Sequence, residues 1–188
     1  MERAYNSPRK YEEYAYVLDF NARGKSTTVR GREGIIITAI GEGRLTLLEI
    51  LGIPNSTFEI GEKIFIGKEG RTNVLSVLGK MDYRRISSSA QTELLGVVEK
   101  IVNENEKKFV DYINNAQPLT PRIHALELIP GIGKTYMKAI LEEREKKKFD
   151  NFKDIQQRIG FKEPVKQITK RILEEITGEA RVNLFVKR

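Results

Sequence analysis

The chain has 188 residues, enough for one or two domains, and 39% of them are hydrophobic. It carries 33 lysines and arginines against 26 aspartates and glutamates, and this formal net charge of +7 favours a polyanionic partner. The absence of cysteine excludes disulfides and thiolate zinc sites, and a single histidine cannot form a histidine-rich metal site. We expect neither a metal nor a cofactor.

The N-terminal sequence and the hydropathy predict a cytoplasmic protein without a membrane partner. No apolar run approaches the roughly 18 residues of a membrane span. The first residues, Met-Glu-Arg-Ala-Tyr, lack the apolar stretch of a secretory signal. Residues 1–10 are polar and basic, and we expect them to form a loose arm.

The first half of the chain is typical of short β-strands separated by glycine turns. Apolar side chains alternate from Tyr14 to Phe20, and the turn at Gly41–Gly43 separates two apolar runs. About five strands of this kind predict a small antiparallel β-barrel of the OB type over residues 1–86. The expected strand regions are residues 14–20, 35–40, 45–50, 58–67 and 74–86.

A long connecting helix is expected next, within residues 87–119. Leu94, Val98, Ile101 and Phe109 form a helical stripe through a highly charged segment. This pattern predicts one continuous helix over residues 90–115.

Residues 120–188 are predicted to form a helical domain with a C-terminal tail strand, which makes the chain an α+β protein. Thr120 is expected to cap a first helix that starts at Pro121, and Gly178 is expected to end the last helix. This segment is also the most basic, with 16 lysines and arginines against 10 aspartates and glutamates. The expected helices cover residues 121–129, 134–147, 151–160 and 164–178.

A glycine-rich turn, Pro130-Gly131-Ile132-Gly133-Lys134, joins two of these predicted helices. Glycine permits a positive φ and leaves no side chain over the N-terminus of the following helix. The free amides and the dipole at that N-terminus favour an anion. On a basic chain, we expect this anion to be a nucleic-acid phosphate, although a simple turn between packed helices is the alternative.

This stretch resembles the helix-hairpin-helix motif, because Met137, Ile140 and Arg144 follow Gly133 at the spacing of that family. The resemblance implies contacts with a nucleic-acid backbone that do not depend on its sequence. The amides of Ile132, Gly133 and Lys134 would face a phosphate. A second, degraded copy at residues 159–164 lacks one glycine, and it is expected to brace the first. The residues that this resemblance assigns to binding are Gly131, Ile132, Gly133, Lys134, Thr135, Lys138 and Arg144.

Two other basic groups are candidate nucleic-acid contacts. Lys146 and Lys147 extend the positive charge near Arg144, although they equally suit a solvated helix end. Tyr83, Arg84 and Arg85 are candidates for a single-strand groove on the barrel.

Two further motifs carry no chemistry in this interpretation. Gly24–Thr27 lacks the upstream glycine and the following helix of a phosphate-binding loop. His124 lies among apolar residues without a partner motif and is expected to be structural.

The whole arrangement resembles an uncharacterised archaeal family of predicted nucleic-acid-binding proteins, with an N-terminal OB-like barrel and a C-terminal helix-hairpin-helix region. This resemblance implies a link to RNA or translation. We therefore expect a nucleic-acid-binding protein, with RNA favoured over DNA. The alternative is an adaptor that docks on a ribosome- or polymerase-like assembly. No metal triad or acid–base pair is visible in the sequence, so enzymatic activity is not expected.

Overall fold

The computed structural model describes residues 11–21 and 27–188, which fold as two compact units. The first unit comprises the described residues up to Leu94 together with Phe185–Arg188, and the second comprises Leu95–Leu184. The expected N-terminal arm and most of the Gly24–Thr27 motif lie outside the described residues.

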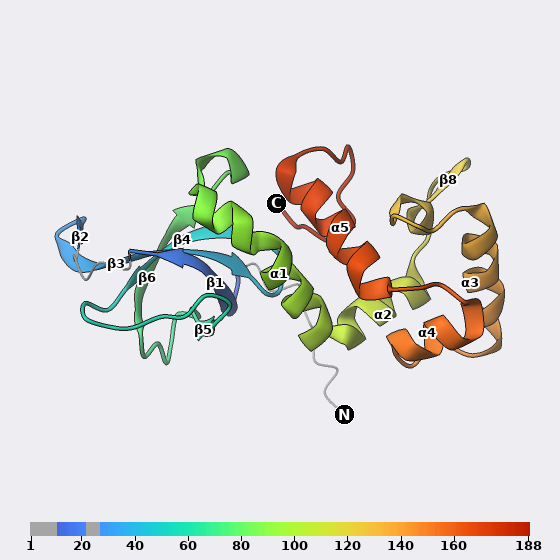
Figure 1. The fold of residues 1–188 in the computed structure, drawn as a ribbon, viewed down its shortest axis with the longest axis horizontal. Helices are drawn as coiled ribbons and strands as arrows, with labels where there is room; N and C mark the ends of the chain where they lie inside the picture. The colour runs from blue at the N-terminus through green and yellow to red at the C-terminus, as the bar shows by residue number, and fades with distance from the viewer. Residues whose placement is uncertain (1–10, 22–26) are drawn as a thin grey trace, which may run out of the picture. The chain divides into compact units, whose positions relative to one another are not determined.

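The first unit contains an antiparallel sheet with the strand order β5-β1-β3-β4-β6, in which β2 pairs with β3 (Figure 1). Val17, Ile37 and Ile50 belong to one buried apolar cluster of β1, β3 and β4. In β1 the four consecutive residues 15–18 are all buried, so both faces of this strand are covered. The bounds of the strands are Tyr14–Phe20 for β1, Thr27–Val29 for β2, Arg32–Gly41 for β3, Leu47–Gly52 for β4, Lys63–Phe65 for β5 and Val74–Lys80 for β6.

The sheet confirms the α+β class, but it does not close into the expected barrel. No ladder joins β5 to β6 among the described strands, so the two ends of the strand path remain unpaired. The predicted strand region 58–67 contributes only three residues to the sheet. Its first part turns instead, because Gly61 adopts a φ of 80° and the amide of Glu62 donates to the carbonyl of Glu59 at 3.1 Å.

The single connecting helix of the prediction is two helices, α1 (Ser88–Glu104) and α2 (Glu106–Asn115), separated at Asn105. Both the amide and the side-chain nitrogen of Asn105 donate to the carbonyl of Ile101, at 3.0 and 2.9 Å. Asparagine favours such local bonds over helix continuation. The break allows α2 to pack within the second unit, where Phe109 and Ile113 are buried.

The predicted helix at residues 121–129 is wrong, because this segment forms a small hairpin followed by a 3-10 turn. The hairpin pairs β7 (Pro118–Thr120) with β8 (Ile123–His124), and η2 spans Ala125–Leu128. The Thr120 hydroxyl does accept a bond from the Ile123 amide, at 3.1 Å, as a helix cap would. The chain then turns back to pair His124 with Pro118, so the capped turn ends there.

The remaining three helices follow the prediction closely. Asn151 accepts a hydrogen bond from the amide of Asp154 at 2.7 Å, as an N-cap does. Gly160 and Gly178 end their helices with φ values of 78° and 85°. The described tail after Gly178 contains no strand, and its last residues are held by bonds such as that from the Lys187 amide to the Arg44 carbonyl, 3.0 Å. The bounds are Lys134–Lys146 for α3, Phe152–Ile159 for α4 and Pro164–Thr177 for α5.

No helix within the described part of the chain combines the length and the apolar character that crossing a membrane requires.

Candidate nucleic-acid interface

The turn between η2 and α3 depends on Pro130 and Gly131. The amide of Ile132 donates to the carbonyl of Ile129 at 3.0 Å, and Gly131 has a φ of 82°. Proline followed by a residue with positive φ is the signature of a type II turn. A Cβ at Gly131 would also lie 3.2 Å from the ring of Phe161, so glycine is required for both conformation and space.

The N-terminus of α3 is exposed and offers unpaired amides. Gly133 is the N-cap residue, and its carbonyl accepts the first helical bond, from Met137 at 2.9 Å. Among the described residues, nothing accepts from the amides of Gly133, Lys134 or Thr135. A Cβ on Gly133 would meet no atom within 4 Å, so the approach to these amides is open.

The expected phosphate contact through Ile132 does not fit this geometry. Its amide closes the type II turn, and its side chain is buried, at 4% exposure. The donors available to an anion are therefore those of Gly133, Lys134 and Thr135, one residue further along the chain than the sequence suggested.

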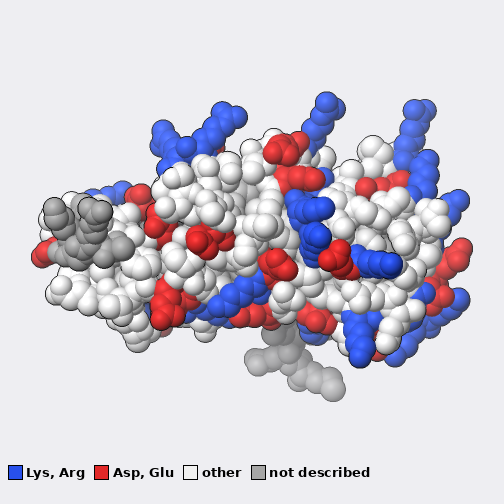
Figure 2. Space-filling view, viewed as in Figure 1, with Lys and Arg blue, Asp and Glu red and all other residues white. Residues whose placement is uncertain are grey.

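The predicted basic residues divide between the two ends of α3. Lys134, Thr135 and Lys138 are exposed near its N-terminus, and neither lysine has an ion-pair partner in the described part of the chain. Arg144, Lys146 and Lys147 lie toward the other end, about 15–20 Å along the helix from Lys134 at 1.5 Å per residue. Figure 2 shows basic side chains of the second unit interleaved with acidic ones.

The basic residues at the C-terminal end of α3 already have partners. The guanidinium of Arg144 donates to the carbonyls of Ile113 and Ala116 at 3.0 and 2.9 Å, where it caps α2. Burial lowers the pKa of Arg144 from its ordinary value. Lys146 pairs with Glu143 at 2.7 Å, and Lys147 pairs with Asp150 at 3.0 Å. These contacts assign Arg144 a structural role and weaken the case for the two lysines.

The second, degraded hairpin packs against the first. Gly160 turns the chain after α4, and the buried ring of Phe161 lies 5.7 Å from that of Tyr136 between ring centroids. The Tyr136 hydroxyl donates to the Gly160 carbonyl at 3.4 Å. Glu163, the N-cap of α5, has a φ of 53° and precedes Pro164, which has no amide hydrogen. This end of α5 presents a carboxylate where α3 presents free donors.

His124 and Glu127 hold the turn that leads into the first hairpin. The Nδ1 atom of His124 accepts from the amide of Leu126 at 3.1 Å, and the carboxylate of Glu127 accepts from the amide of His124 at 2.9 Å. Burial, assisted by the charge of Arg144, lowers the pKa of His124, whereas Glu127 opposes this shift. The histidine therefore serves as a neutral cap.

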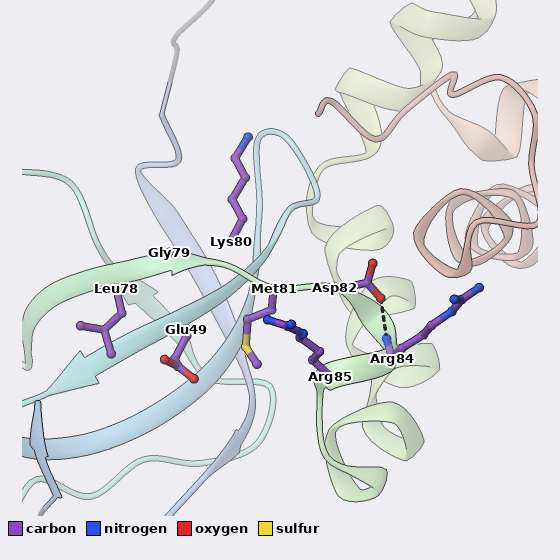
Figure 3. Close-up of a pocket in the computed structure, with 8 residues that line it drawn as sticks. All are labelled: Glu49, Leu78, Gly79, Lys80, Met81, Asp82, Arg84 and Arg85. Atoms are coloured by element: carbon purple, nitrogen blue, oxygen red, sulfur yellow. Dashed lines mark hydrogen bonds between the residues drawn. The ribbon is translucent and has the colours of Figure 1, made fainter.

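In the first unit, Tyr83–Arg85 forms a single 3-10 turn, η1, capped by the carboxylate of Asp82, which accepts from the Arg84 amide at 2.9 Å. Arg84 and Arg85 are exposed and border an open hollow of about 750 Å³, whereas Tyr83 is half-buried and not part of its lining (Figure 3). Glu49 and Gly79, which no sequence motif singled out, also line this hollow. No local pattern relates them, since only strand pairing brings them together.

Residues 11–21 and 27–188 contain no group of three or more histidine, aspartate or glutamate side chains placed to hold a metal ion. The donors described above are backbone amides and basic side chains, which suit an anion.

Comparison with known proteins gives three consistent matches. The profile of a family described as protein of unknown function, DUF655, matches residues 11–187. The chain is 41% identical over 184 residues to "Uncharacterized protein MJ0038" of Methanocaldococcus jannaschii, and the match covers 97% of this chain and 83% of that protein. The chain also superposes on the crystal structure of Af1531 from Archaeoglobus fulgidus, whose title names DUF655, with a TM-score of 0.80. The two sequences are 38% identical, and the match covers 94% of this chain and 100% of that one. The chain belongs to the DUF655 family.

Proposed function

We propose that this protein binds nucleic acid without enzymatic activity, with RNA preferred over DNA, and that it contacts the phosphate backbone through the hairpin at Gly131–Lys134. The observation that carries this proposal is the exposed N-terminus of α3, where three amides have no partner among the described residues. Lys134 and Lys138 add charge beside these donors. This combination suits a phosphate in a helix-hairpin-helix arrangement, because the helix dipole and the amides act together.

The sheet of the first unit supports a second part of the proposal. We interpret its five-strand path as a partly open OB-type barrel, a fold that binds single strands. The gap between β5 and β6 is compatible with this interpretation, because OB barrels are often incompletely closed. Arg84 and Arg85 would then contribute phosphate contacts from the first unit.

The decisive test is the substitution Gly133→Ala. The backbone at Gly133 has a φ of −86°, and a Cβ there meets no atom within 4 Å, so the variant should fold normally. The added methyl group would keep a phosphate away from the amides. We expect roughly tenfold weaker binding to RNA of any sequence, about 1.4 kcal/mol. Fluorescence anisotropy with labelled RNA of mixed sequence measures this change.

The matched control is Gly96→Ala, which adds the same methyl group to an exposed position of α1 with open space around it. The control should bind as the wild type does. Equal binding by Gly133→Ala and Gly96→Ala would remove the hairpin from the mechanism. For the wild type, contacts with about four to six phosphates predict a slope of roughly −3 to −5 for log K against log salt, and a slope near zero would contradict backbone binding.

The second candidate function is that of a protein adaptor, which the small hairpin of β7 and β8 favours. Leu119 and Ile123 on this hairpin are 45% and 44% exposed, and together they give it a small exposed apolar surface. An adaptor would bind a protein partner through such contacts, and its affinity would survive high salt. Loss of partner binding in Leu119→Ser, with unchanged RNA binding, would favour this function.

A further inference from the structure

The hollow beside η1 contains an unusual polar group, the carboxylate of Glu49. This residue lies in the middle of β4, where its neighbours across the ladders are Thr38 on β3 and Gly79 on β6. The side chain is half-buried, yet it forms no hydrogen bond or ion pair with the described residues. Glu49 lines the hollow, and its carboxylate accepts from no donor among the described residues, so its oxygens are available to a ligand there.

Gly79 leaves its part of the hollow's lining open, because it has no side chain. Gly79 lies on β6, directly opposite Glu49 of β4. A Cβ on Gly79 would nevertheless meet no atom within 4 Å. Glycine inside a strand often marks a place where a ligand approaches the backbone. The register of β4 with β6 also shifts between Glu49 and Ile50, which opens the ladder locally.

The rest of the lining combines apolar and basic groups. Leu78 and Met81 are half-buried and offer an apolar surface. Arg84 and Arg85 are exposed, as is Lys80, and none of the three has an ion-pair partner within the described residues. Figure 3 shows that Arg85 extends from η1 toward Met81 on the side of Glu49, whereas Arg84 extends in the opposite direction.

We propose that this hollow binds one unpaired nucleotide of a single strand, and that Glu49 selects a base with an amino group, so that cytosine is preferred to uracil. A nucleotide has the three features that the lining complements, namely a donor group on the base, an aromatic face and a negative phosphate. Glutamate accepts from the N4 amino group of cytosine, whereas uracil places a carbonyl oxygen at the same position. The base packs on Met81 and Leu78, and an adjacent phosphate contacts Arg85.

This inference rests on the proposed function, because it assumes that the protein binds nucleic acid. It assigns a different role to a different unit, however. The hairpin of the second unit would contact the backbone of any sequence, while the hollow of the first unit would read one base. The two roles can therefore fail separately.

The test compares eight-nucleotide oligo(C) and oligo(U) RNA by fluorescence anisotropy. We expect the wild type to bind oligo(C) roughly tenfold more tightly, which corresponds to the lower end of the range for one hydrogen bond to a charged acceptor. Glu49→Gln should bring this ratio close to one, because glutamine can donate to uracil as well as accept from cytosine. Glu69→Gln is the matched control, since Glu69 is exposed and the same charge is lost. It should keep the preference.

A second variant guards against loss of folding. Gly79→Val suits a β-strand, and its Cβ meets no atom within 4 Å, so the protein should fold while the added side chain narrows the hollow and weakens binding of both oligonucleotides. Equal affinity of the wild type for the two oligonucleotides, or an unchanged preference in Glu49→Gln, overturns the inference. If Gly133→Ala binds RNA normally but the preference for cytosine persists, the hairpin proposal fails and the hollow remains.

Discussion

The two hairpins of the second unit have the same plan and different surfaces. Each turns on a glycine with positive φ, Gly131 or Gly160, and then buries one apolar side chain, Ile132 or Phe161. After this point they differ. The first ends in Gly133 and the open amides of α3, whereas the second ends in Glu163, which places a carboxylate at the N-terminus of α5.

This difference shows that one turn geometry can either leave the amides of the next helix open or place a carboxylate beside them. The geometry depends on the first glycine and the apolar residue, which both hairpins keep. Access to the amides of the following helix depends on the next two residues. Only in the first hairpin do these residues leave the amides unobstructed. Phe161 of the second hairpin lies beside Gly131 and Tyr136, so the second hairpin supports the conformation of the first.

The largest effect is expected from Phe161→Ala, which removes the contact between the hairpins. Phe161 is 2% exposed, and loss of a buried phenyl ring should lower the free energy of unfolding by about 3–5 kcal/mol. Urea denaturation followed by circular dichroism measures this loss. Ile123→Ala, at an exposed position of the same unit, should change the stability by less than about 0.5 kcal/mol. Similar midpoints for the two variants would show that the hairpins do not depend on one another.

Gly133→Glu gives the first hairpin the carboxylate of the second. The side chain has room, so the fold should persist, but a negative charge would then lie beside the amides. We expect RNA binding to weaken about 100-fold, or about 2.7 kcal/mol, in an anisotropy titration at low salt. Gly96→Glu adds the same charge on α1 and should have a much smaller effect. Equal losses in both variants would mean that only the net charge matters.

Glu163→Gly makes the second hairpin more like the first. Glutamate is strained at a φ of 53°, and glycine relieves this strain at the cost of a more flexible unfolded chain. The exposed pair with Lys166, at 3.6 Å, contributes little. We expect a net gain of about 0.5–1 kcal/mol in thermal or urea unfolding, together with two- to threefold tighter RNA binding as a carboxylate is lost. A loss of stability would show that Glu163 forms contacts that offset its strain.

The smallest effect is expected from the pH dependence of the cap at His124, which only the first hairpin has. Its pKa is lowered from 6.5 in the folded state, so the unfolded chain binds the proton more readily. The contribution of His124 to the free energy of unfolding should be complete above about pH 6.5. It should decrease as the pH falls below this value, by less than about 1.4 kcal/mol per pH unit.

The measurement is urea unfolding between pH 5 and pH 7.5. His124 is the single histidine of the chain, and the carboxylates of Glu143 and Asp154, whose pKa values are lowered, titrate at more acidic pH. His124→Asn keeps a capping acceptor and should flatten the profile. A profile of the same slope in this variant would assign the pH dependence to other groups.

The sequence alone determined the elements whose signals are local. Asn151, Gly160 and Gly178 begin or end helices through bonds and φ values within a few residues, and the structure confirms each of them. The turn at Pro130–Gly131 is of the same kind, because proline and glycine restrict the backbone directly. Alternating side chains likewise predicted β1, and the continuous apolar run at residues 35–40 predicted β3, because strand signals of both kinds are local.

Only the tertiary structure decided which groups remain free. The Ile132 amide is used by its own turn, and Arg144 is used by carbonyls of α2 about thirty residues earlier in the chain. The same holds for Glu49, whose position opposite Gly79 depends on the pairing of β4 with β6. Local sequence fixes backbone conformation, but the availability of a donor or an acceptor depends on every group that packs near it, and those neighbours come from distant parts of the chain.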